Sequence, residues 1–233
     1  MNKMIGEDSY TKEFKSKIIN LDKENYLVEL ENTFFYGKGG GQPGDIGILI
    51  TELGNVNVTE TIKKDEKILH KVDSTNNLKI GEIVKGKIDW GKRYKFMKMH
   101  TALHLLCSAV PMGVTGGQIG EFKSRLDFNA DANSINKEDL QKKLNLILKN
   151  QHEITYQWID SKELEKKPEL IRTMSVKPPK TNGKIRLVKI GNIDLQPCGG
   201  THVNNTSEIG KIIVGKIENK GKMNRRINIS LSD

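Results

Sequence analysis

The 233-residue sequence predicts an α+β protein, in which a small β domain precedes a two-layer domain with helices on an antiparallel sheet. Short apolar runs separated by turn residues fill residues 11–90, which is typical of a small barrel or sandwich. Residues recur at helical spacing from near Asp89, and the strands and helices after this point favour helices packed on an antiparallel sheet. We therefore expect two domains, spanning residues 1–90 and 91–233.

The N-terminal domain is expected to consist of strands. Tyr26, Val28 and Leu30 alternate with their neighbours after a polar turn at residues 22–25, which predicts a half-buried strand. Gly, Asn, Asp and Lys separate the later runs, as in turns. Further strands are predicted over residues 46–51, 56–62, 67–72, 78–80 and 82–88.

A glycine-rich loop interrupts this β pattern. Gly39, Gly40, Gly41 and Gln42 lie within residues 36–47, and consecutive glycines allow positive φ and close approach of a ligand or another backbone. The loop lacks the Gly-Lys-Ser/Thr ending of a P-loop, and no helix follows it. A plain β-turn and a ligand-cradling loop both fit the residues at this point.

The second domain should alternate strands and helices. The first helix begins near Asp89 and ends before Pro111, and a strand-like alternation leads to Phe128. We expect a second helix over residues 135–150 with Ser134 as N-cap, and a short helix in which Asp160 and Glu163 form a capping box. Strands are predicted over residues 154–158, 185–190, 193–195, 211–217 and 226–231.

Composition narrows the class of protein. The net charge of +9 favours a polyanionic partner, nucleic acid first, although lysines scattered over solvated faces would give the same value. Two cysteines make no disulfide framework, and Cys107 fits a buried core thiol. Residues 1–10 are polar, and no apolar run approaches the length of a membrane span. We therefore expect a cytoplasmic protein with no membrane partner.

Two short segments carry metal-binding side chains at a four-residue spacing. His100 and His104 would share one face of the first helix, because positions i and i+4 are neighbours on a helix. Cys198 and His202 repeat the spacing almost a hundred residues later, with two glycines between them. Three imidazoles and one thiolate form a tetrahedral ligand set that suits zinc, so the sequence predicts one Zn²⁺ per chain.

The chemistry of such a site has several interpretations. Four protein ligands can make zinc purely structural, whereas an open position allows a zinc-bound water to attack an ester or amide. A His-Glu-x-x-His metalloprotease is excluded, because Thr101 stands where the catalytic Glu would be. A Cys198/His202 nucleophilic dyad would leave the two helical histidines unexplained.

At these residues the sequence resembles a known family. The segments HTALHLL, QPCGGTHV and TSEIGKIIVGKIENKGKMNRRI resemble the editing domain of alanyl-tRNA synthetase and, more closely, the freestanding AlaX proteins. The earlier FFYGKGGGQPGDIG resembles the glycine-rich motif of the medium-length AlaX class, which belongs to an N-terminal β-barrel. The resemblance covers nearly the whole chain and implies a barrel followed by an α+β editing domain.

The resemblance also implies an activity. The chain would be a trans-editing hydrolase that deacylates Ser-tRNA(Ala) at the zinc site, with Gly-tRNA(Ala) as a second candidate substrate, while sparing Ala-tRNA(Ala). A zinc-bound water would be the nucleophile, with no protein base assigned. The zinc ligands would be His100, His104, Cys198 and His202, and the substrate contacts would be Thr101, Gln118, Gly39, Gly40, Gly41, Gln42, Asn224, Arg225 and Arg226.

Two alternatives to the editing enzyme stay open. A non-catalytic, zinc-stabilised tRNA-binding module would bind tRNA without releasing an amino acid. A zinc hydrolase of small esters or amides would act without tRNA. The sequence has no aminoacylation signature, so a synthetase is excluded, and both monomer and homodimer fit the sequence.

Overall fold

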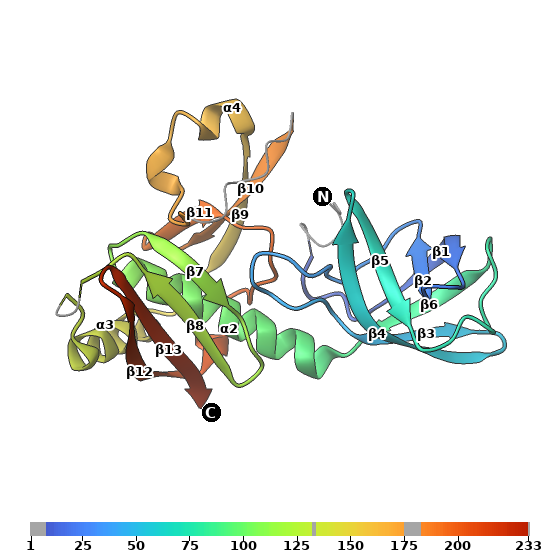
Figure 1. Cartoon of the computed structure of the whole chain (residues 1–233), viewed down its shortest axis with the longest axis horizontal. Helices are drawn as coiled ribbons and strands as arrows, with labels where there is room; N and C mark the ends of the chain where they lie inside the picture. Colours follow the sequence, from blue (N-terminus) through green and yellow to red (C-terminus); the bar gives the residue numbers. More distant parts are fainter. Residues whose placement is uncertain (1–7, 132–133, 175–182, 233) are drawn as a thin grey trace. The chain divides into compact units, whose positions relative to one another are not determined.

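The computed structural model describes residues 8–131, 134–174 and 183–232, and the chain divides into two compact units, Met1–Tyr94 and Lys95–Asp233. A closed barrel precedes antiparallel sheets and helices, so the predicted α+β class is confirmed (Figure 1). Helix α2 (Trp90–Ala109) runs from the first unit into the second. The predicted domain boundary falls at the first residue of this helix.

The strands of the first unit close into a barrel in the order β1-β2-β5-β4-β3-β6, with antiparallel pairs throughout. Alternating apolar residues fill its interior, including Ile18, Val28, Leu49 and Val84. Closure leaves no unpaired sheet edge. The strands are β1 (Glu13–Asp22), β2 (Leu27–Leu30), β3 (Gly47–Thr51), β4 (Gly54–Lys64), β5 (Lys67–Val72) and β6 (Ile83–Ile88).

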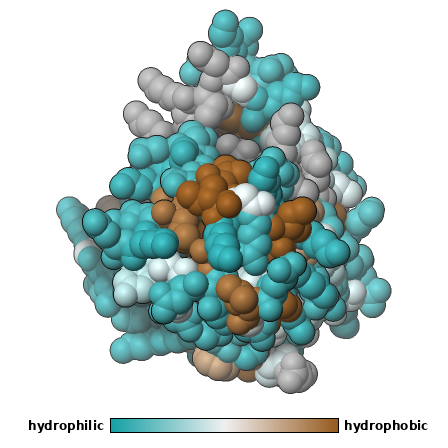
Figure 2. Space-filling model, turned by 90° about the vertical axis from the view of Figure 1, so that its right-hand side faces the viewer, coloured by the Kyte–Doolittle hydropathy of each residue, from teal (hydrophilic) through white to brown (hydrophobic). Residues whose placement is uncertain are grey.

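The strand predicted over residues 78–80 is wrong. Leu78 is buried in the barrel core, but Ile80 is 65% exposed and lies in a turn that Gly81 continues at φ 90°. Ile83 and Ile19 are also exposed, on the paired strands β6 and β1. Figure 2 shows that one face of the molecule carries hydrophobic patches among hydrophilic residues. An apolar run therefore did not identify a buried strand here.

The second unit contains two antiparallel sheets. One has the order β12-β13-β8-β7 and the other the order β11-β10-β9, and α3 packs against β12. The strands of the first sheet are β7 (Val114–Gln118), β8 (Lys123–Phe128), β12 (Lys211–Gly221) and β13 (Asn224–Ser232). Those of the second are β9 (Ile154–Asp160), β10 (Lys184–Ile190) and β11 (Asp194–Pro197). The glycine-containing strand β7 was not predicted.

Two predicted helix caps need correction. Helix α3 (Lys137–Lys149) begins two residues later than predicted, because Asn136 is its N-cap and accepts bonds from the amides of Glu138 and Asp139 at 2.9 and 3.1 Å. The Ser134 hydroxyl instead donates to the Asp131 carbonyl. Helix α4 (Ser161–Leu164) follows Asp160, but that side chain makes no capping bond, so the predicted capping box does not form. The short 3₁₀ segments are η1 (Pro168–Leu170) and η2 (Thr206–Ile209).

Helix α2 is buried on almost all sides in the second unit. Met97, Ala102, Leu105 and Leu106 are fully buried, and they lie around the helix rather than on one stripe. A helix segment that is buried on nearly all sides belongs in a core, and this position desolvates polar side chains there such as His100 and His104. No helix in the described part of the chain is long and apolar enough to cross a membrane.

Candidate metal centre

The buried part of α2 carries the first two donors of the predicted metal centre. His100 and His104 are 7% and 6% exposed, and their ring centroids lie 5.2 Å apart. This spacing follows from the i, i+4 geometry of the helix. The helix thus holds two imidazoles side by side, away from water.

The loop after β11 brings the other two donors to the same place. The Sγ atom of Cys198 lies 3.4 Å from His100 Nε2 and 3.3 Å from His202 Nε2. The His202 ring lies 4.2 and 4.6 Å, between centroids, from the rings of His100 and His104. The donor atoms of all four residues lie within 4.8 Å of one another, so this group, here called the metal cluster, can hold one metal ion.

Arg186 holds the loop that carries Cys198 and His202. Its buried guanidinium donates from Nε to the Cys198 carbonyl at 2.9 Å and from Nη2 to the Gly200 carbonyl. The Cys198 amide donates back to the Arg186 carbonyl at 3.1 Å, and the guanidinium stacks over the ring of Tyr156. The loop is therefore fixed through its backbone, which leaves its side chains to face α2.

The electrostatics of the cluster favour a metal-binding thiolate. Burial raises the pKa of Cys198, but the nearby rings of His100 and His202 outweigh it and hold the pKa well below its usual value. Burial and His100 hold the pKa of His202 well below its usual value. Burial also lowers the pKa of His104, but hydrogen bonds with Asp194 and Cys198 outweigh it and raise the pKa to about 10. A thiolate is the form of cysteine that binds metals.

The donor chemistry therefore fits zinc. Three imidazoles and one thiolate are borderline-soft ligands, which zinc accepts in a tetrahedral arrangement. The set contains no carboxylate, whereas calcium and magnesium prefer oxygen ligands. The predicted residues are thus brought together by the fold.

Buried neighbours that the sequence analysis did not single out contact the cluster. Asp194 Oδ2 lies 2.9 Å from His104 Nδ1, and Gln196 Nε2 donates to the same oxygen at 2.8 Å. Both come from β11, two residues apart, so they share one face of the strand. The available signal was a pair of polar residues alternating within an apolar segment just before Cys198.

Thr101 contacts the cluster in an unexpected way. It is fully buried, and its hydroxyl donates to the Met97 carbonyl at 3.0 Å. The same oxygen lies 3.1 Å from His202 Nδ1 and accepts from the Val203 amide at 3.3 Å. This hydroxyl is therefore engaged by protein groups on all sides.

The other predicted substrate contacts of this unit lie in the sheet that contains β7 and β13. Gln118 ends β7, is exposed and pairs with Arg125 of β8. Asn224 begins β13 and accepts a bond from the Thr115 hydroxyl at 3.4 Å. Arg225 is buried and donates to Asn219 and to two carbonyls of its own hairpin, whereas Arg226 pairs with Asp127 at 2.8 and 2.9 Å. Both arginines thus already have protein partners.

The glycine-rich loop of the first unit forms a tight turn. Gly39 and Gln42 exchange backbone hydrogen bonds of 3.1 and 2.9 Å, and the exposed Gly40 and Gly41 between them have φ values of 56° and 81°. Two central residues with positive φ define a hairpin turn of the primed type, which glycine adopts without strain. The segment is therefore a β-turn, and its tip is open to solvent.

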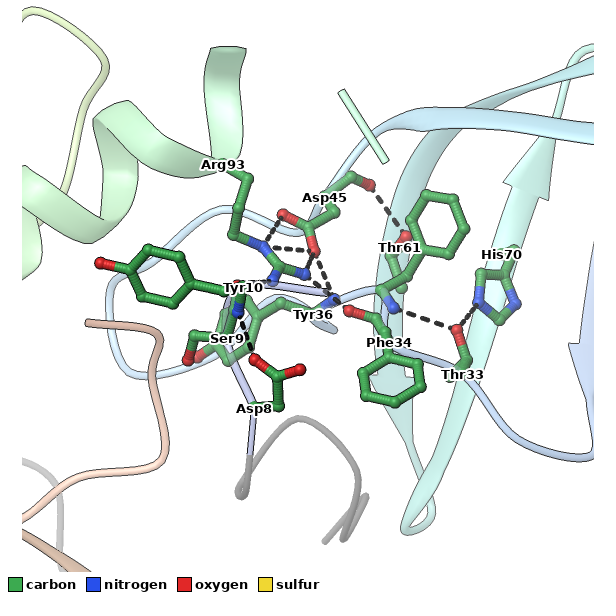
Figure 3. Close-up of polar contacts among 11 residues, drawn as sticks. Asp8, Ser9, Tyr10, Thr33, Phe34, Tyr36, Asp45, Thr61, His70 and Arg93 are labelled. Carbon is green, nitrogen blue, oxygen red and sulfur yellow. Dashed lines mark hydrogen bonds and ion pairs between the residues drawn. The ribbon is translucent and has the colours of Figure 1, made fainter. Parts of the chain in front are cut away.

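A buried ion pair fixes the base of this turn (Figure 3). The Arg93 Nε donates to the Asp45 carboxylate at 2.9 Å, and both side chains are buried. The same guanidinium donates to the carbonyls of Ser9 and Phe34 at 2.9 and 2.6 Å. Because Asp45 also accepts from the Tyr36 amide, the two ends of the loop are tied together.

Two protein families match separate parts of the chain. The family described as tRNA synthetases class II (A) matches residues 3–92, and the family described as Threonyl and Alanyl tRNA synthetase second additional domain matches residues 185–228. The alanyl-tRNA editing protein AlaX-M of Saccharolobus solfataricus is 37% identical over 95% of this chain and 94% of its own length. The alanyl-tRNA editing protein AlaX-L of Pyrococcus horikoshii is 35% identical over 99% of this chain and 58% of its own length. The alanine–tRNA ligase of Sulfurisphaera tokodaii is 36% identical over 93% of this chain and 24% of its own length.

Proposed function

The chain belongs to the alanyl-tRNA editing proteins, and from this premise we propose that it deacylates tRNA(Ala) carrying a wrong amino acid. Ser-tRNA(Ala) is the first proposed substrate and Gly-tRNA(Ala) the second, whereas Ala-tRNA(Ala) is spared. The observation that carries the proposal is the match with AlaX-M over nearly the full length of both chains. The metal cluster supports it, because ester hydrolysis is a reaction that a zinc site performs.

The metal cluster would hold the zinc ion. Its residues would be His100, His104, Cys198 and His202, whose donor atoms converge in a buried site. A zinc ion held there would supply a Lewis acid for an ester carbonyl or lower the pKa of a water to about 7. The protein's part is to desolvate the site, fix the rings and bring the aminoacyl end to them.

The proposed reaction is hydrolysis of the aminoacyl ester. Water adds to the ester carbonyl, the bond to the ribose oxygen breaks, and the amino acid and a free tRNA hydroxyl are released. Serine differs from alanine by one hydroxyl, so a site that hydrogen-bonds this group leaves polar atoms unpaired when alanine binds. We assign this contact to Gln118, whose amide can both donate and accept.

The remaining substrate contacts are proposed for the tRNA end. The turn at Gly39–Gly41 has an exposed tip at Gly40 and Gly41, which offers backbone groups without side-chain hindrance, and the buried Gln42 would support this turn. Asn224, Arg225 and Arg226 are proposed near the substrate end, where their hairpin would meet the acceptor strand. The net charge of +9 supports a phosphate-rich partner, and binding should therefore weaken as salt rises.

The experiment measures release of amino acid from Ser-tRNA(Ala) and Ala-tRNA(Ala) by zinc-loaded and chelator-treated protein. We expect loss of serine, retention of alanine, and loss of activity with chelation that zinc restores. tRNA binding without ester loss would overturn the enzyme in favour of a binding module. Equal cleavage of a free serine ester without tRNA would instead identify a small-ester hydrolase.

A further inference from the structure

We propose that Asp194 and Thr101 are positioning residues that set the ring tautomers of His104 and His202, so that both rings present Nε2 to the metal. The proposal rests on the metal centre of the proposed function and not on its substrate. Its observations are two hydrogen bonds to Nδ1 atoms, of 2.9 Å from His104 to Asp194 and of 3.1 Å from His202 to Thr101.

The Thr101 hydroxyl has a determined role because it has one proton. That proton goes to the Met97 carbonyl at 3.0 Å, since a carbonyl oxygen only accepts. The oxygen then has lone pairs to accept from the Val203 amide and from His202 Nδ1. With this assignment His202 carries its proton on Nδ1, which leaves the Nε2 lone pair for a metal.

Asp194 gives His104 the same tautomer through different chemistry. A carboxylate accepts and does not donate, so the proton between Asp194 Oδ2 and His104 Nδ1 belongs to the ring. Gln196 Nε2 donates to the same oxygen at 2.8 Å and holds the carboxylate in place. Gln196 Nε2 also lies 3.0 Å from His104 Nδ1. In this assignment both nitrogens donate to the same Asp194 oxygen and do not bond to each other.

Each of the two contacts joins one ligand-bearing segment of the chain to the other. Thr101 lies on α2 and holds a ring of the Cys198–His202 loop, whereas Asp194 lies on β11, just before that loop, and holds a ring of α2. Both positioning side chains are buried, so water does not compete for the Nδ1 atoms. Each segment thus orients a ligand of the other, and the two halves of the cluster are braced together.

The first test measures zinc affinity by competition with a chromogenic chelator. Asp194→Asn can turn its amide donor toward Nδ1 and favour the wrong tautomer, so we expect zinc binding about 10- to 100-fold weaker, as for other partners behind metal ligands. Thr101→Val removes the hydroxyl at constant shape and should weaken zinc binding several-fold. Thr101→Ser keeps the hydroxyl and should bind zinc as the wild-type protein does.

The matched control is Ser108→Ala on the same helix. The Ser108 hydroxyl also donates to a carbonyl one turn earlier, that of Leu105, but none of its observed contacts is with the cluster. Its removal should leave zinc affinity unchanged. Unchanged affinity in both Asp194→Asn and Thr101→Val, with the fold intact by circular dichroism, would overturn the proposal.

The second test needs no variant. Nitrogen-15 spectra of the histidine rings in the zinc-loaded wild-type protein distinguish a protonated Nδ1 from a metal-bound one. We expect His104 and His202 to bind through Nε2 and to keep a proton on Nδ1. Coordination of either ring through Nδ1 would refute the assignment. Neither test uses tRNA, so failure of the editing activity would leave this inference standing.

Discussion

Two groups of buried polar side chains, one in each unit, show how differently the same residue can be used. The first unit holds His70, Thr33, Asp45 and Arg93, here called the barrel cluster, and the second unit holds the metal cluster. His70 is fully buried, and its ring nitrogens meet the Val28 carbonyl at 3.0 Å and the Thr33 hydroxyl at 2.9 Å. Burial lowers the pKa of His70 to about 4, whereas the pKa of His104 is raised to about 10.

The difference lies in the partners and not in the burial. In the barrel cluster, both nitrogens of the His70 ring bond to protein groups, and the Arg93 guanidinium meets a carboxylate and two carbonyls. In the metal cluster, the Nε2 and Sγ atoms of separate segments face one another. Donor atoms that converge in a buried site can hold a metal ion, whereas a buried histidine by itself does not indicate one.

The largest expected effect comes from removing a converging donor. Cys198→Ala should weaken zinc binding by more than ~100-fold and abolish deacylation, since a lost ligand exceeds the 10–100-fold cost of a lost outer partner. Cys107→Ala is the matched control, because Cys107 is the other of the two cysteines in the sequence and is not in the cluster. The two variants are compared by chelator competition and by Ser-tRNA(Ala) hydrolysis. Equal zinc affinity and equal hydrolysis in Cys198→Ala and Cys107→Ala would refute the proposed difference between the two clusters.

In the barrel cluster, the largest effect should be on folding. Arg93→Met leaves the buried Asp45 carboxylate uncompensated, and we expect a loss of about 3–5 kcal/mol in the free energy of unfolding, measured in urea. Zinc affinity should not change. Lys85→Met, which breaks the exposed pair with Glu13, serves as the control and should leave the urea midpoint unchanged. A midpoint for Arg93→Met equal to that of the control would refute the role of the pair.

His70 should make the barrel sensitive to acid. The unfolded chain binds a proton near pH 6.5 and the folded barrel only near pH 4, so stability is complete above pH 6.5 and is lost as pH falls toward 4. The loss should reach about 3 kcal/mol. It is measured as the difference from His70→Gln, whose neutral amide replaces both hydrogen bonds.

The two proteins are compared in a background that carries Trp158→Phe, so that the tryptophan signal comes from the first unit. Trp158→Phe leaves Trp90 as the remaining tryptophan, and Trp90 lies in the first unit. Because the background protein and its His70→Gln variant both retain the metal cluster, the titration of that cluster cancels in the difference. A stability difference between these two proteins that stays constant from pH 7 to pH 4 would show that His70 is not buried in its neutral form.

The smallest effect concerns an exposed polar residue. Gln118→Ala should reduce the preference for Ser-tRNA(Ala) over Ala-tRNA(Ala) by about 10-fold, the worth of one hydrogen bond of about 1.4 kcal/mol. Gln157→Ala, an exposed glutamine on β9, should leave it unchanged. Clearance of serine at the normal rate by Gln118→Ala, with alanine still spared, would remove Gln118 from the pocket.

Local patterns predicted most of the strands and the identity of the donors. Period-two alternation marked the barrel strands, and the four-residue spacing of His100 and His104 already implied one helix face. The predictions from these patterns failed where a neighbouring residue determined the local structure instead. Asn136 caps α3 in place of Ser134, and Gly81 turns the chain where an apolar run suggested a strand.

The sequence by itself determined the donor types, their spacing within each segment and the basic charge, because these are properties of neighbouring residues. The tertiary structure alone decided that Asp194 meets His104, that Thr101 faces His202, and that His70 is enclosed by protein partners. These contacts join residues that lie 37 to 101 positions apart. Hydrogen-bond partners at such separations depend on how sheets and helices close around a core, and no local periodicity encodes that closure.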